Sequence, residues 1–101
     1  MSQTRMLLAA LAMAMVVFSN TAIAGMQKTA DALKGTIATI EKADVPNNPA
    51  LTEALERARD LSKNYWKLSK TQVYRNAAVI YDDLRSALKG TSLDIIKPSW
   101  L

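Results

Sequence analysis

The uninterrupted stretch between Pro49 and Gly90 restricts the fold of this chain most, because it contains neither glycine nor proline. Apolar residues recur along it at intervals of three and four, which is the pattern of helices that bury one face. The first apolar stripe consists of Leu51, Leu55, Ala58, Leu61, Tyr65 and Leu68. The second consists of Val73, Ala77, Ile80, Leu84 and Leu88. The stretch therefore predicts α-helix along most of its length.

A break in the rhythm separates the two stripes, because the step from Leu68 to Val73 is five residues. We place a boundary between two helices there, over residues 49–68 and 71–89, with Thr71 as the N-cap of the second. The alternative is one unbroken helix of about 40 residues. Such a helix could not bury its length against a single further helix, so it would require a hairpin-like dimer.

Another helix is predicted over residues 26–44, where apolar residues again recur at intervals of three and four. These residues are Met26, Ala30, Leu33, Ile37 and Ile40. The helix should end before Pro46, because a residue that precedes proline is pushed out of the α region. Asn48 then suits the N-cap and Pro49 the first position of the next helix, and Gly90 suits a left-handed stop after the last helix. The predicted fold is a small all-α bundle of three helices.

Residues 1–24 differ from the rest of the chain and have the features of a cleavable export signal. After Arg5 comes an apolar run of 13 residues, Met6 to Phe18, which is too short for a stable helix across about 30 Å of hydrocarbon. The predicted cleavage motif, with the cut before the glycine, consists of Ala22, Ala24 and Gly25. We therefore expect export to the periplasm or beyond the cell. Retention of residues 6–24 as an uncut anchor is the alternative.

The remaining residues, 25–101, carry 12 basic and 9 acidic side chains and lack both cysteine and histidine. The lack of cysteine excludes a disulfide framework, a zinc finger, a thiol nucleophile and c-type haem attachment. The lack of histidine excludes a Ser-His-Asp triad and imidazole metal ligands. A domain this small buries only about 60 % of the surface of its unfolded chain, so we expect helix packing, a partner or both to stabilise it. We predict no enzymatic activity and no cofactor.

Cations and aromatic rings are concentrated between Asp60 and Asp82, where the chain has no carboxylate. We call residues 63–75 the aromatic-basic segment. Its candidate partner-binding residues are Lys63, Tyr65, Trp66, Lys67, Lys70, Tyr74 and Arg75. The three lysines have the i, i+4, i+7 spacing that places them on one face of a helix, beside the tryptophan. Such a face suits an acidic protein surface or lipid headgroups. The alternative is a solvated face whose rings turn partly into the core.

The tail at residues 91–101 is rich in apolar residues around Pro98 and has three interpretations. It folds back over the bundle and covers apolar surface, it docks on a partner that orders it, or it is disordered. Its candidate partner-binding residues are Ile95, Ile96, Trp100 and Leu101.

The remaining charges are expected to pair along helices. Glu53 with Arg57 and Asp82 with Arg85 have the spacing of favourable helical ion pairs. Asp82 and Asp83 are adjacent carboxylates, but neighbouring side chains on a helix point about 100° apart. We therefore predict no metal site at this pair.

These features predict an exported, non-enzymatic accessory protein that docks on another envelope protein through the aromatic-basic segment and the tail. A secretion or conjugation apparatus is a setting for such a role. The alternative function is a membrane-active or toxin-like effector that uses the same tryptophan, tyrosine and lysine side chains on anionic lipid. Nucleic acid is not expected as a partner, because the net charge of residues 25–101 is only +3 and exported proteins rarely meet it. Homo-oligomerisation would follow from the long-helix alternative.

Overall fold

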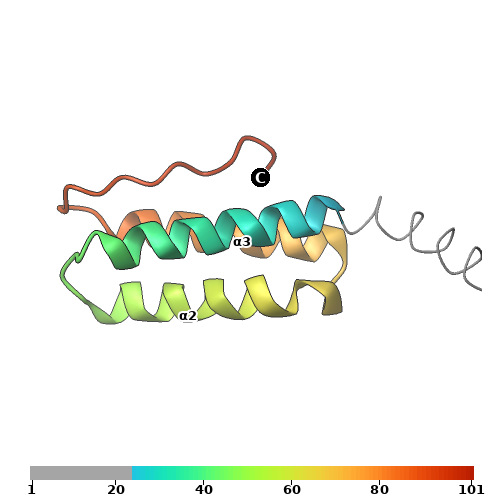
Figure 1. The fold of residues 1–101 in the computed structure, drawn as a ribbon, viewed down its shortest axis with the longest axis horizontal. Coiled ribbons are helices and arrows are strands. Elements are labelled where there is room, and N and C mark those ends of the chain that lie inside the picture. Colours follow the sequence, from blue (N-terminus) through green and yellow to red (C-terminus); the bar gives the residue numbers. More distant parts are fainter. Residues whose placement is uncertain (1–23) are drawn as a thin grey trace, which may run out of the picture.

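The computed structural model describes residues 24–101 of the chain. This part forms a helix at residues 24–42, α2 (Pro49–Asn64) and α3 (Lys70–Ala87), and a short 3-10 helix, η1 (Tyr65–Lys67), joins the last two. The described residues contain no strand. The three helices lie side by side and the chain reverses direction from each to the next (Figure 1). The predicted all-α three-helix bundle is confirmed, and the prediction of one long helix is wrong, because α2 packs along α3.

The apolar stripes predicted from the sequence form the core of the bundle. Every residue of the stripes is buried except Tyr65 and Leu68, which are half-buried at the far end of α2. The core also takes in residues that the stripes omit, namely Thr29, Ala54, Ser62, Tyr81 and Ile95. Every buried side-chain nitrogen or oxygen in residues 24–101 has a hydrogen-bond partner.

The buried tyrosine links α3 to the first helix. The hydroxyl of Thr36 donates to the carbonyl of Ala32 at 2.9 Å and lies 3.0 Å from the hydroxyl of Tyr81. Because a carbonyl can only accept, Thr36 uses its one proton there, and the Tyr81 hydroxyl is therefore the donor in the second bond. This hydrogen bond joins the buried Tyr81 to a half-buried threonine and helps to fix the register of the two helices.

The ends of the helices differ from the predicted ones by a few residues. The first helix ends at residue 42 rather than 44, because Asp44 adopts a left-handed φ of 50°. α2 begins as predicted, with Pro49 in its first turn and the side chain of Asn48 accepting from the amide of Leu51 at 2.8 Å. It ends at Asn64, four residues early, because the chain tightens into η1.

The N-cap of α3 is Ser69, so the prediction of Thr71 is wrong. Ser69 and Gln72 form a capping box: the serine hydroxyl accepts from the amide of Gln72 at 3.2 Å, and the Gln72 side chain accepts from the amide of Ser69 at 3.1 Å. This reciprocal arrangement satisfies two backbone amides at once. At the other end, α3 stops at Ala87, and Gly90 has the expected left-handed φ, 85°.

The ion pairs of the described chain join different elements, so the two predicted helical pairs are wrong. Arg57 of α2 pairs with Asp83 of α3 at 2.9 Å instead of with Glu53. Asp82 is 3.7 Å from Lys97 of the tail instead of pairing with Arg85. A further pair joins Arg59 of α2 and Glu41 of the first helix. In each case a cation reaches a carboxylate on a neighbouring element, which the spacing along one helix does not reveal.

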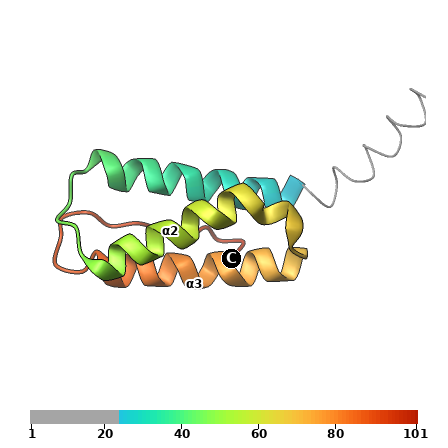
Figure 2. The same ribbon diagram turned by 90° about the horizontal axis from the view of Figure 1, so that it is seen from below.

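The tail at residues 91–101 runs back along the groove between the first helix and α3, on the side opposite α2 (Figures 1 and 2). Ile95 is buried in the core, and Leu93 and Leu101 pack against it half-buried. The tail therefore folds back over the bundle, as the first of its three interpretations expects.

We predict that replacement of Tyr81 by phenylalanine has a pH-dependent effect on stability. Burial raises the pKa of Tyr81 above its ordinary value. The unfolded chain therefore ionises first, and the native protein should lose this contribution as pH rises above about 10. At pH 7, Tyr81→Phe should lower the free energy of unfolding by about 1 kcal/mol, because one buried hydrogen bond is lost.

Urea unfolding followed by circular dichroism from pH 7 to pH 11 measures both effects. The difference in the free energy of unfolding between the native protein and Tyr81→Phe should become smaller above about pH 10. A difference that stays constant over this range would show that Tyr81 ionises equally easily in both states.

Candidate functional site

The aromatic-basic segment forms the corner at which the chain passes from α2 to α3. The corner is held locally, because the amide of Leu68 donates to the carbonyl of Tyr65 at 3.1 Å and the capping box of Ser69 follows directly. Three consecutive turns of structure, the end of α2, η1 and the start of α3, therefore present their side chains around one end of the bundle (Figure 1).

Trp66 is the most prominent side chain of this corner. It is 62 % exposed, yet its orientation is defined by two contacts. The indole Nε1 donates to the carbonyl of Lys63 at 3.1 Å, and the Nζ of Lys67 lies 5.2 Å from the centroid of the ring. A large aromatic ring held in one orientation in solvent is suited to contact another surface.

The three lysines do not share one helix face, so that part of the prediction is wrong. Lys63 lies in the last turn of α2, Lys67 in η1 and Lys70 at the start of α3. The helix boundary separates them, and they are arranged around the corner instead. All three are exposed, as is Arg75, and none of the four has an ion-pair partner within residues 24–101.

Tyr74 connects the aromatic-basic segment to the start of the first helix. It is half-buried, and its hydroxyl lies where a Cβ on Gly25 would be, only 2.5 Å from that position. The Nζ of Lys70 is 5.6 Å from the Tyr74 ring centroid. Tyr74 can lie against this turn because residue 25 is a glycine, and Tyr65 is likewise half-buried. Neither tyrosine is as free for a partner as Trp66.

The tail meets the same turn of the first helix. Trp100, 37 % exposed, donates from its Nε1 to the hydroxyl of Thr29 at 3.1 Å, and the Nζ of Lys28 lies 4.0 Å from its ring. Thr29 in turn donates to the carbonyl of Gly25 at 3.0 Å. Among the four predicted docking residues of the tail, only Ile96 projects freely, with 84 % of its surface exposed. The others support the bundle.

The charges are distributed unevenly along the bundle. Seven of the nine carboxylates of the chain lie in residues 41–56 and 82–94, which together form the end opposite the aromatic-basic segment (Figure 1). The bundle is therefore electrically polar, with a cationic corner at one end and most of its acidic side chains towards the other. Sequence reasoning missed this polarity, because it depends on the direction in which each helix runs.

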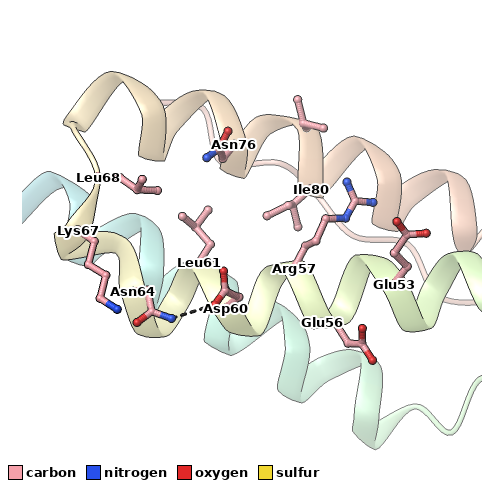
Figure 3. Close-up of a pocket in the computed structure, with 11 residues that line it drawn as sticks. Glu53, Glu56, Arg57, Asp60, Leu61, Asn64, Lys67, Leu68, Asn76 and Ile80 are labelled. Carbon is pink, nitrogen blue, oxygen red and sulfur yellow. Dashed lines mark hydrogen bonds between the residues drawn. The ribbon is translucent and has the colours of Figure 1, made fainter.

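A groove of about 720 Å³ lies between α2 and α3. Leu61, Leu68 and Ile80 point between the two helices and form its apolar part (Figure 3). The α2 wall bears carboxylates, namely Glu53, Glu56 and Asp60, whereas the α3 wall presents Asn76, Val79 and Ile80.

The titratable side chains of the groove lie on its α2 side and in η1, and its α3 wall carries none. The residues that the structure describes also contain no cluster of three or more potential metal ligands. No helix within residues 24–101 has both the length and the apolar character to span a membrane. The cleavage motif residue Ala22 lies outside the described residues, whereas Ala24 and Gly25 are helical and are the first two residues that the structure describes.

Comparison of the chain with models of known protein families, with curated proteins and with solved structures finds no match.

We predict that Gly25→Ala and Tyr74→Phe are energetically coupled. Alanine is favoured over glycine in helices by about 1 kcal/mol, but in the native protein its Cβ would displace the Tyr74 hydroxyl. Removal of that hydroxyl should allow alanine to stabilise the helix, so we expect a coupling free energy of at least about 0.5 kcal/mol between the two substitutions. Urea unfolding of the two single variants and the double variant measures it.

Gly35→Ala is the matched control, because a Cβ at Gly35 would meet no atom within 4 Å. It should stabilise the native protein and Tyr74→Phe equally. Additive effects of Gly25→Ala and Tyr74→Phe would contradict the close contact.

Proposed function

We propose that this chain is an exported, non-enzymatic helical protein that docks its aromatic-basic segment on an acidic surface of another envelope protein. The observation that carries the proposal is the oriented and exposed indole of Trp66, with the Nζ of Lys67 5.2 Å from its ring centroid. The aromatic-basic segment to which it belongs carries four cations without ion-pair partners in the described chain. An accessory role in a secretion or conjugation apparatus is part of the same proposal.

The preorganised ring of Trp66 favours a protein partner. Tryptophan is enriched among the residues that dominate binding energy in protein interfaces. A ring already held by the Lys63 carbonyl and stacked with Lys67 loses little freedom when it is buried. The surrounding cations would attract an acidic surface and orient the encounter, and the polar charge distribution along the bundle strengthens that orientation.

The tail enters this proposal in a supporting role. Because Trp100, Ile95 and Leu101 pack on the bundle, the docking surface is the corner itself. The tail braces the first helix, against which Tyr74 rests, and so stabilises one side of the corner.

An anionic membrane surface is the second candidate partner. It is favoured by the position of residue 24, because the described chain begins at the same end as the aromatic-basic segment (Figures 1 and 2). The apolar run that ends at Phe18 is seven residues from Gly25, and seven residues reach at most about 25 Å. While that run engages a membrane, the cationic corner would be held near its surface, where aromatic and basic side chains bind headgroups.

A photo-crosslinking amino acid at Thr71, introduced into the full chain expressed in a bacterial envelope, tests the protein partner directly. Thr71 is exposed beside the corner, and Thr52 is an exposed threonine at the opposite end. We expect discrete protein adducts from Thr71 and not from Thr52. Trp66→Ala should reduce these adducts about tenfold, the effect of removing an interface residue that contributes above 1 kcal/mol.

Charge reversal supplies the matched control for this experiment. Lys67→Glu with Lys70→Glu should abolish the adducts, whereas Lys42→Glu with Lys89→Glu, the same charge change at the opposite end, should leave them intact. Equal loss from both pairs would indicate a nonspecific charge effect and contradict the proposed site.

Vesicles of phosphatidylcholine with phosphatidylglycerol distinguish the second candidate. Salt-sensitive sedimentation with these vesicles, with no protein adducts from Thr71, would show that the partner is the membrane surface and not a protein. Absence of both adducts and vesicle binding would overturn the aromatic-basic segment as the functional site.

A further inference from the structure

We infer that removal of the export segment completes the docking site, because the new α-ammonium group of Gly25 joins the cations of the aromatic-basic segment. This inference rests on the proposed function and adds a form of regulation to it: the processed protein binds an acidic partner more tightly than the unprocessed one.

The position of Gly25 is the basis of the inference. A Cβ on this residue would lie 2.5 Å from the Tyr74 hydroxyl and 3.6 Å from Cε of Lys70, both in the aromatic-basic segment. The carbonyl of Gly25 accepts from Thr29, which also accepts from Trp100. The residue predicted to become the N-terminus is therefore built into the corner and held there from two sides.

The chemistry of the cut changes the charge at this place. Hydrolysis of the peptide bond between Ala24 and Gly25 consumes one water, leaves a carboxylate on Ala24, and converts the uncharged amide nitrogen of Gly25 into an amine. An α-amine in water has a pKa of about 7.7–8.0, so at about pH 6 it takes up a proton. The processed corner then carries five cations in place of four, the others being those of Lys63, Lys67, Lys70 and Arg75.

The new charge would be poorly neutralised within the protein itself. It lies at the N-terminus of the first helix, where the helix dipole disfavours a cation. Lys70 is adjacent and Lys28 is one turn away, whereas the aromatic-basic segment has no carboxylate to offer. A carboxylate from a docking partner would remove this unfavourable situation, which is why the processed form should gain affinity.

The test compares residues 25–101 with a free α-amine and the same chain acetylated at that amine. Every described core residue lies at or after Met26, so both proteins contain the whole core, and circular dichroism verifies their fold. The probe is a peptide of ten glutamates, whose binding is followed by tryptophan fluorescence at low salt. Acetylation should weaken binding about 2- to 5-fold, the range of one exposed charge pair. The difference should disappear at high salt, where exposed charges are screened.

The outcomes separate this inference from the proposed function. Equal affinity of the two folded forms, with binding still abolished by Lys67→Glu and Lys70→Glu, would overturn the role of the α-ammonium and leave the docking surface intact. No binding of the probe by either form, or binding unaffected by the charge reversals, would overturn both.

Discussion

The reversal of the chain at Ser69 is the constraint on which the rest of the bundle depends. In a continuous helix Val73 would lie about 140° around the axis from Leu68, so one long helix could not bury both stripes on one narrow face. The capping box of Ser69 and Gln72 ends this conflict, because it begins a new helix with its amides satisfied. Both stripes then face a common core, and the side chains between them are left at the corner.

The sequence was sufficient to predict the core and insufficient to predict the contacts between elements. Periodicity identified the buried faces, and Asn48 and Gly90 marked two of the helix ends, because these features act through local backbone geometry. Contacts between elements are not given by such local rules: Arg57 pairs with Asp83 of α3 and not with Glu53, four residues away on its own helix. The lysines around the corner were misplaced for a related reason. Their arrangement follows from the Ser69 cap, whose signature was already present in the spacing of Ser69 and Gln72.

In this small bundle without cysteine, two threonines link the first helix to the tail and to α3. Thr29 and Thr36 each donate to the carbonyl four residues earlier, and each lies beside an aromatic donor from another element, Trp100 or Tyr81. Because each threonine hydroxyl uses its proton on the backbone, its oxygen is free to accept from the aromatic side chain. Each aromatic ring then buries apolar area while its one polar group is hydrogen-bonded. Threonine in an amphipathic helix is ordinarily read as a polar surface residue, so neither contact could be predicted from the stripe.

The direction of the helices converts an ordinary composition into a polar molecule. With a net charge of only +3 over residues 25–101, a uniform distribution would attract acidic surfaces weakly. The fold instead leaves four cations at a corner whose segment has no carboxylate and brings most carboxylates towards the opposite end, so a surface of negative charge would attract one end of the bundle and repel the other. Such a field orients an encounter but does not hold it, because exposed charge pairs contribute little affinity. Trp66, with Lys67 beside its ring, supplies the missing apolar contact. This combination of an orienting field with one preorganised ring favours the corner as a binding surface.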